Sequence, residues 1–215
     1  QLFVGADAAA HARTVLHFDQ YDNIFMQLSG EKTFLLFDPL QSGKICPYPI
    51  HHPLDRSAQL DLEETVAAQH AKGYTRLGDA KGCLVTLKAG DVLVLPAYWW
   101  HEVITEPRSA KLKAADPNGD DAMTVSLNLW FTPMHRMLQP ELPLSPMLRV
   151  ELARQLEFLI CDALDDRPEL VPRFCAALIA FTTGSAALSE QGGAGGTLDP
   201  EQLAARLWES AQAST

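Results

Sequence analysis

The hydrophobic pattern of this 215-residue chain changes near Thr132. Before that point the apolar runs are short and end in turn-forming residues, as in residues 34–39 (FLLFDP) and 89–96 (AGDVLVLP). Short apolar runs separated by Gly, Asp and Pro are typical of strands joined by turns. We therefore expect a mainly β region up to about residue 135.

From Pro143 onward the apolar residues follow a helical period instead. Ser145 and Pro146 suit a helix start, and the residues that recur at helical spacing are Leu148, Leu152, Leu156, Leu159 and Ala163. A second helix is expected from about residue 174 to 184, a flexible linker at the glycine-rich residues 192–196, and a last short helix after Asp199. The predicted parts are a β core (1–135), a helical hairpin (136–185), and a linker with a terminal helix (186–215).

Charge and composition exclude several classes of protein. A formal net charge of -10 argues against nucleic-acid binding, because neutralising phosphates requires clustered Lys and Arg. No apolar run approaches the roughly 20 residues that span a bilayer, and no signal-peptide pattern opens the chain. The four cysteines are scattered without a Cys-x-x-Cys pair, so we expect reduced thiols. These features indicate an intracellular soluble protein, cytoplasmic or nuclear if eukaryotic, without a membrane partner.

His17 and Asp19, together with the distant His101, are the candidate metal ligands. Two imidazoles and one carboxylate form the ligand set of non-haem Fe(II) sites, which leave coordination positions open. Because His17 and Asp19 are two residues apart, both side chains can leave the same face of a strand. An isolated His-x-Asp pair also occurs by chance in loops, so this pair alone is weak evidence. Only a closed fold brings His101 to the other two residues.

The segment 124–130 predicts a strand with two different faces. Thr124, Ser126, Asn128 and Trp130 share one parity, and Val125, Leu127 and Leu129 share the other. A polar face between apolar neighbours favours a strand that lines a cavity.

Three longer stretches, residues 17–39, 47–56 and 90–101, carry a family resemblance. In them the chain resembles the JmjC-type 2-oxoglutarate oxygenases, and most closely the asparaginyl hydroxylase that acts on hypoxia-inducible factor. The resemblance covers residues from about 2 to 184. It implies a double-stranded β-helix of the cupin (jelly-roll) type with a C-terminal α-helical extension. The chain begins with Gln1 directly before an expected strand, so we expect that residues are missing upstream.

The same resemblance implies a role for each of a set of residues. His17, Asp19 and His101 would bind Fe(II). The expected 2-oxoglutarate contacts are Lys32, Thr14, Asn23, Asn128, Phe25 and Val103, and the expected substrate contacts are Arg56 and Trp130. Lys32 also has a physical reason that is independent of the family, because the charges of Fe(II), Asp19, the oxoglutarate dianion and Lys32 cancel in a poorly solvated cavity. An isolated lysine after a turn would otherwise be read as solvated.

The implied activity is a dioxygenase that uses Fe(II), 2-oxoglutarate and O2 to hydroxylate a protein or peptide side chain, with oxidative decarboxylation of 2-oxoglutarate to succinate and CO2. Two alternatives remain open, an N-methyl-lysine demethylase and a non-catalytic metal-binding cupin scaffold. Ser57 follows Arg56 where the resembling hydroxylase has a glutamine that helps to hold the target amide. The resemblance further implies a homodimer formed through the C-terminal helices.

Overall fold

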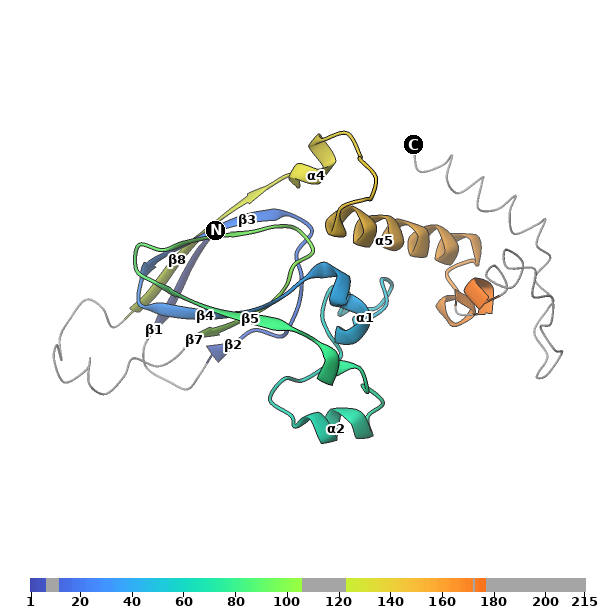
Figure 1. Cartoon of the computed structure of the whole chain (residues 1–215), viewed down its shortest axis with the longest axis horizontal. Helices are drawn as coiled ribbons and strands as arrows, with labels where there is room; N and C mark the ends of the chain where they lie inside the picture. Colours follow the sequence, from blue (N-terminus) through green and yellow to red (C-terminus); the bar gives the residue numbers. More distant parts are fainter. Residues whose placement is uncertain (7–11, 106–122, 172, 177–215) are drawn as a thin grey trace. The chain divides into compact units, whose positions relative to one another are not determined.

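Two antiparallel sheets face each other in the computed structural model, which describes residues 1–6, 12–105, 123–171 and 173–176 (Figure 1). In the described part of the chain the first sheet has the order β1 (Leu2–Ala6), β8 (Met123–Phe131), β3 (Asp22–Ser29) and β6 (Val92–Leu95). The second sheet has the order β2 (Ala12–Arg13), β7 (Trp100–Thr105), β4 (Glu31–Phe37) and β5 (Gly82–Lys88). The expectation of a mainly β, jelly-roll-type fold is confirmed.

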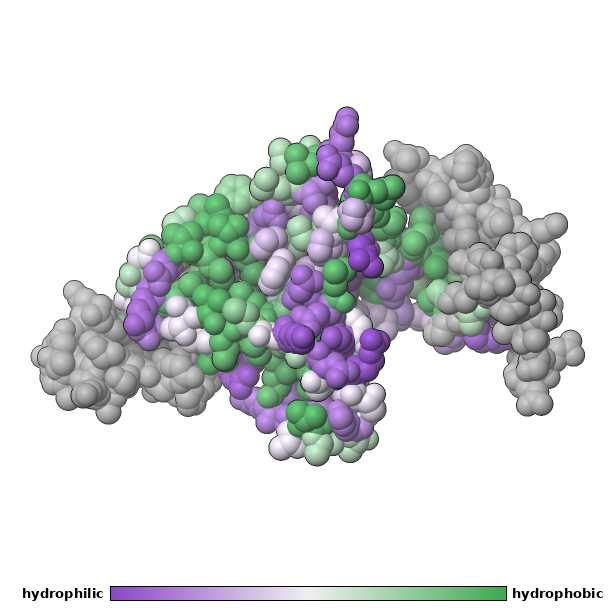
Figure 2. Space-filling model, viewed as in Figure 1, coloured by the Kyte–Doolittle hydropathy of each residue, from purple (hydrophilic) through white to green (hydrophobic). Residues whose placement is uncertain are grey.

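The first sheet turns its polar residues inward. On β8, Ser126 and Asn128 are buried, and β3 places Gln27 and Phe25 directly opposite them. The alternate residues of β8 face outward, and Leu129 is 38% exposed. The two faces that alternation predicted for this strand are therefore present, and the polar face is the one that lines the interior. Figure 2 shows hydrophobic surface gathered over the strands.

Gly30 makes the tight connection from β3 to β4. Its φ of +72° lies in the left-handed region, and a Cβ at this position would lie 2.7 Å from Thr124 Oγ1. Only glycine meets both demands without strain. The register of β3 against β8 also shifts between Gln27 and Ser29, as at a β-bulge. The connection places Lys32 as the second residue of β4, on the side of that strand that faces the interior.

The segment between β4 and β5 contains short helices that the sequence pattern did not predict. They are η1 (Pro39–Gln41), α1 (Ser42–Ile45), α2 (Val66–Ala71) and η2 (Leu77–Asp79), and α1 and α2 lie beyond the same end of the strands (Figure 1). Helices of six residues or fewer are too short to show a 3.6-residue period. The Gln41 side chain closes the segment, because it accepts from Lys81 N–H and donates to Lys81 C=O, both at 2.7 Å.

The described residues after β8 contain helices, as the sequence indicated. After α4 (Met134–Met137), α5 runs over Pro146–Ala163, and η4 follows at Pro168–Leu170. Ser145 caps α5, because its Oγ accepts from Leu148 N–H at 3.3 Å. The predicted start of this helix at Ser145 and Pro146 is thus confirmed. No helix among the described residues is long and apolar enough to cross a membrane.

The chain divides into two compact units, Gln1–Val150 and Glu151–Thr215. The first unit holds both sheets. In the second, Ala163, Leu164 and Phe174 form a small buried cluster. The predicted second helix beyond residue 176, the linker at 192–196 and the terminal helix after Asp199 lie outside the described residues.

Candidate metal centre

His17 does not lie in a regular strand, contrary to the expectation that residues 17–19 form one. It makes isolated bridges to Ser57 and to His101. His17 N–H donates to His101 C=O at 3.0 Å, and His101 N–H donates to His17 C=O at 2.7 Å. A single bridged residue between two neighbouring segments satisfies its own backbone hydrogen bonds without a continuous β-ladder. The backbones of the two histidines are therefore held together directly.

The turn before β7 is tied to Asp19. Tyr98, in this turn, has a φ of +67°, and its N–H donates to Asp19 C=O at 2.7 Å. Trp100, two residues after Tyr98, is fully buried, and its Nε1–H donates to Ser42 Oγ at 2.9 Å. Trp100 also contacts the edge of Phe18. The buried Phe18 side chain belongs to the hydrophobic core, whereas the flanking His17 and Asp19 line a pocket.

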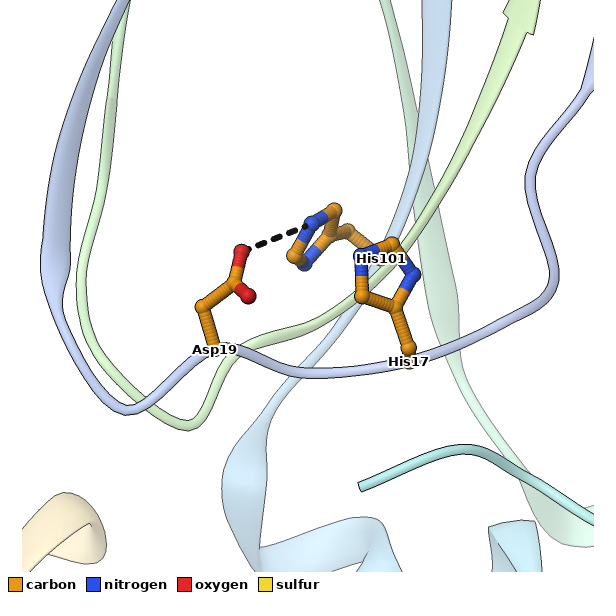
Figure 3. A group of neighbouring side chains, drawn as sticks. All are labelled: His17, Asp19 and His101. Atoms are coloured by element: carbon orange, nitrogen blue, oxygen red, sulfur yellow. Dashed lines mark ion pairs between the residues drawn. The ribbon is translucent and has the colours of Figure 1, made fainter. Parts of the chain in front are cut away.

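The three predicted ligands converge. One ligand atom from each of His17, Asp19 and His101 lies within 4.8 Å of the other two. His101 Nε2 is 3.5 Å from Asp19 Oδ2, and the two imidazole centroids are 4.2 Å apart. The side chains point toward one another in Figure 3. This is the spacing that a shared ion requires.

Backbone carbonyls fix which imidazole nitrogens are available. His17 Nδ1 lies 2.8 Å from Val15 C=O, and His101 Nδ1 lies 3.0 Å from Trp99 C=O. A carbonyl can only accept, so each Nδ1 must carry the hydrogen, and each Nε2 then presents a lone pair when the ring is neutral. An imidazole whose other nitrogen is held in this way is the usual arrangement of a metal-bound histidine.

Burial shifts the pKa of two of these groups in the direction that favours the neutral form. Burial, assisted by the neighbouring His17, lowers the pKa of His101 from 6.5 to about 3, so His101 is neutral at physiological pH. Burial also raises the pKa of the Asp19 carboxyl, against the opposing effects of His17 and Arg56. A divalent ion would supply the positive charge that a buried carboxylate needs. The donor set therefore fits a divalent metal.

The three residues line a pocket of about 230 Å³. This volume is below the range of about 300–1,000 Å³ for drug-sized ligands, so the pocket suits a small molecule. It is lined by Phe3, Thr14, His17, Asp19, Asn23, Phe25, Lys32, Phe34, His101, Val103, Asn128 and Trp130. All the residues that were expected to contact 2-oxoglutarate thus face one cavity.

Lys32 lies in this pocket as a half-buried cation. Its Nζ donates to Ser126 Oγ at 2.7 Å and lies 5.5 Å from the ring centroid of Phe3 and 5.4 Å from that of Phe25. Burial lowers the pKa of Lys32. No carboxylate among the described residues forms an ion pair with it. An anionic ligand would give this ammonium the counter-charge that the described residues do not provide.

Polar atoms on the pocket wall are left without partners. The Oδ1 atoms of Asn23 and Asn128 are buried and have no hydrogen-bond partner. Buried amide oxygens normally have one, and the waters of a metal's coordination shell are suitable donors. Thr14 Oγ1 accepts from Val103 N–H at 2.9 Å, so its own hydrogen remains available for a ligand.

The two expected substrate residues behave differently. Trp130 lines the pocket and is 37% exposed. Arg56 does not line it, yet it is near enough to Asp19 to lower the pKa of that carboxyl. The sequence reasoning missed Phe3 and Phe34 as pocket walls, and Ser126 as the partner of Lys32. Alternation along the strands that carry Lys32 and Asn128 was the signal that could have found Phe34 and Ser126, whereas Phe3 lies on β1 and is placed opposite Ser126 by the pairing of the strands.

Comparisons with known proteins agree with the fold. A family model described as a cupin-like domain matches residues 1–137. The lysine-specific demethylase JMJ31 of Arabidopsis thaliana is 26% identical over 62% of this chain and 21% of its own length. The HSPB1-associated protein 1 homolog of Danio rerio is 32% identical over 60% of this chain and 24% of its own length.

A third relative, the bifunctional peptidase and (3S)-lysyl hydroxylase JMJD7 of Homo sapiens, is 32% identical over 44% of this chain and 34% of its own length. In each of these three comparisons the match spans about a third or less of the relative. The two sheets of the first unit and the family match over 1–137 lead to one conclusion: this chain belongs to the cupin-like domain family.

Proposed function

We propose that the chain is an Fe(II)- and 2-oxoglutarate-dependent dioxygenase that hydroxylates a protein side chain. One observation carries the proposal. His17, Asp19 and His101 bring three ligand atoms within 4.8 Å of one another on the wall of a small pocket that also contains the Lys32 ammonium. A three-ligand N/O site beside a cation that has no carboxylate partner among the described residues suits a metal ion together with a small dianion.

Most residues of the pocket have a place in this proposal. His17 and His101 offer Nε2 lone pairs, and Asp19 offers a carboxylate oxygen. Lys32 pairs with the distal carboxylate of 2-oxoglutarate, with the Thr14 hydroxyl as a second donor. The remaining cosubstrate contacts are the amides of Asn23 and Asn128 and the apolar side chains of Phe25 and Val103. Trp130 and Arg56 contact the substrate.

Iron and 2-oxoglutarate, when bound at these residues, would supply the oxygen chemistry: one atom of O2 would be inserted into a C–H bond of the substrate, and the other would enter succinate as CO2 leaves. The chain's own residues bind the metal and the cosubstrate, orient the substrate and exclude water. Phe25, Phe34 and Val103 give the cavity apolar walls. The carbonyls of Val15 and Trp99 hold the two imidazoles in one orientation.

A demethylase is the second candidate, because relatives named lysine-specific demethylases match over 60–62% of this chain. Hydroxylation of an N-methyl group releases formaldehyde, whereas hydroxylation of a side-chain carbon leaves a stable product with one added oxygen. The pocket residues are compatible with both outcomes. Substrate identity therefore decides between them.

Turnover without a substrate tests the oxygenase proposal. Purified protein is incubated with Fe(II), 2-oxoglutarate, ascorbate and O2, and succinate is measured. We expect succinate formation that Asp19→Ala abolishes and that the control Asp79→Ala, which changes an exposed carboxylate in η2, retains. If folded protein neither binds 2-oxoglutarate without oxygen nor forms succinate, a non-catalytic scaffold is the better description.

Mass spectrometry of candidate peptides then separates the two reaction outcomes. A hydroxylase adds one oxygen atom to an unmodified peptide, and fragmentation locates the residue that carries it. Loss of a methyl group from a methyl-lysine peptide, with release of formaldehyde, identifies a demethylase instead.

We also propose that the helices of residues 136–185 mediate homodimer formation. The apolar side chains of Leu152, Leu156 and Phe158 are about half exposed on α5, which supports an interface there. Sedimentation equilibrium of the wild type and of Leu152→Asp tests this. A dimer that becomes a monomer in the variant agrees with the proposal, and a monomeric wild type contradicts it.

A further inference from the structure

Asp22, the first residue of β3, uses both carboxylate oxygens to hold backbone groups from distant segments. Oδ1 accepts from Ala97 N–H at 2.8 Å, and Oδ2 accepts from Met134 N–H at 2.8 Å. Ala97 is fully buried and precedes His101 by four residues. Met134 is the first residue of α4. One side chain therefore joins the segment of Asp19, the turn before His101 and the start of a helix.

The turn held by Asp22 needs such support. Tyr98 has a φ of +67°, which is unfavourable for a residue with a large side chain. Two successive N–H groups of the turn are bound from the segment 19–22, since Tyr98 N–H donates to Asp19 C=O and Ala97 N–H donates to Asp22 Oδ1. The segment that supplies one candidate ligand thus also fixes the backbone that leads to another.

The second bond of Asp22 reaches the helix α4. The residue before this helix, Pro133, makes no side-chain capping bond. The first N–H of the helix is instead bound by Asp22, which is far away in the sequence. Asp22, Pro96 and Met134 also line a second pocket, of about 650 Å³, in the first unit. Asp22 therefore lines this second pocket, and the next residue, Asn23, lines the pocket of the candidate metal centre.

We propose that Asp22 is a positioning residue for the candidate metal centre. Its bond to Ala97 fixes the turn 96–99 against the segment that carries Asp19, and thereby sets the separation between the ligand atoms of Asp19 and His101. The bond to Met134 secures α4 and has no part in this positioning. The inference rests on the proposed function to the extent that His17, Asp19 and His101 bind a divalent ion.

The test measures metal binding rather than activity. Asp22→Ala removes both acceptors, and the variant is titrated with Co(II) by calorimetry while the visible absorption bands of the ion report its ligand geometry. We expect about 10-fold weaker binding, as for other residues that orient metal ligands, and altered Co(II) bands. Thermal unfolding of the metal-free protein is measured in parallel.

Two further variants separate positioning from a general loss of stability. Asp91→Ala removes a carboxylate that likewise binds a backbone N–H at a turn, that of Lys88 at 2.8 Å, and we expect it to lower thermal stability without changing Co(II) affinity. Met134→Pro removes the donor in α4, together with an exposed side chain, and leaves the bond to Ala97 in place. Pro133, at φ -56° and ψ 131°, already has a conformation that a following proline accepts. We expect wild-type Co(II) binding in this variant.

Each outcome has a defined meaning. Wild-type affinity and unchanged bands in Asp22→Ala overturn the inference while leaving the proposed function standing. Equal weakening by Met134→Pro and Asp22→Ala overturns the route through Ala97. If Asp22→Ala does not fold, Asp22→Leu, which also removes both acceptors but keeps the bulk of the side chain, is titrated in its place, with the same expected weakening. A wild-type protein that binds no Co(II) overturns both the inference and the proposed function.

Discussion

The two ends of the 230 Å³ pocket are built in different ways. At the metal end, His17 and Asp19 lie outside the regular strands and are held by backbone bridges and turns. At the other end, Lys32, Phe25 and Ser126 lie on regular strands of the two sheets. Alternation along strands therefore suffices to build a pocket wall, whereas bringing three ligands around one point here combines a strand residue, His101 on β7, with two residues of irregular backbone.

The two ends also differ electrostatically. At the metal end burial favours the neutral form of His101, and it raises the pKa of Asp19. At the other end burial lowers the pKa of Lys32, and the ammonium has Ser126 as its hydrogen-bond partner. Burial therefore disfavours the charged forms of Asp19 at one end and of Lys32 at the other, and binding of a ligand of opposite charge would offset this. The metal end suits a cation, and the lysine end suits an anion.

The largest effect is expected from His17→Ala. The bridge between residues 17 and 101 uses backbone atoms alone, so the variant should fold while it loses one metal ligand. We expect Co(II) or Mn(II) affinity to fall by more than about 100-fold, beyond the range seen when outer-shell partners are lost. Calorimetry measures the affinity, and circular dichroism checks the fold.

The control for this change is His70→Ala, which removes an exposed histidine on α2. It should leave both the affinity and the melting temperature unchanged. If His17→Ala fails to fold, the His17 side chain is needed for folding, and the view that backbone bonds alone support the metal end is wrong.

A smaller effect, confined to the other end, is expected from Lys32→Met. Loss of one partner of a buried ion pair costs about 2 kcal/mol or more, so 2-oxoglutarate binding should weaken by roughly 30-fold. Metal affinity should not change, because Lys32 is not one of the three candidate ligands. The stability of the ligand-free protein should not fall, since burial already disfavours the charged lysine.

Lys88→Met is the matched control, because Lys88 lies on the neighbouring β5 with a side chain that is 70% exposed. It should bind 2-oxoglutarate as the wild type does. Equal weakening by both variants would indicate a general electrostatic effect and would remove Lys32 from the proposed site.

The smallest effect concerns the pH dependence of the metal-free protein. The folded-state pKa of His101, about 3, lies below its ordinary value of 6.5. Between these values the unfolded chain binds a proton that the folded chain does not, so stability falls as the pH falls below 6.5. Between pH 6.5 and 5 we expect a loss of about 1–2 kcal/mol from this residue.

Urea unfolding of the wild type and of His101→Gln at the two pH values measures this contribution, because effects of other groups cancel in the difference. The variant should lose less stability on acidification. Identical losses in the two proteins would show that burial of His101 does not govern the pH response of the metal end.

The sequence predicted the two ends unequally. At the lysine end the inward positions of β3, β4 and β8 follow from strict alternation, and the residue pattern of 124–130 alone indicates the polar face with Ser126 and Asn128. At the metal end the residue types were identified, but the expected strand over 17–19 is wrong, because His17 is a bridged residue between Ser57 and His101. Asp22 was not singled out, since hydrogen bonds to Ala97 and Met134 leave no local pattern.

The sequence by itself determined the β core, the start of α5 at Pro146 and the identities of the candidate ligands, because alternation, helical period and side-chain chemistry are local properties. Tertiary structure alone decided that His101 meets His17 and Asp19, that Lys32 lies between two phenylalanine rings, and that Arg56 lies outside the pocket. These are contacts between residues far apart in the chain. They depend on how strands and turns close in space, which no short stretch of sequence specifies.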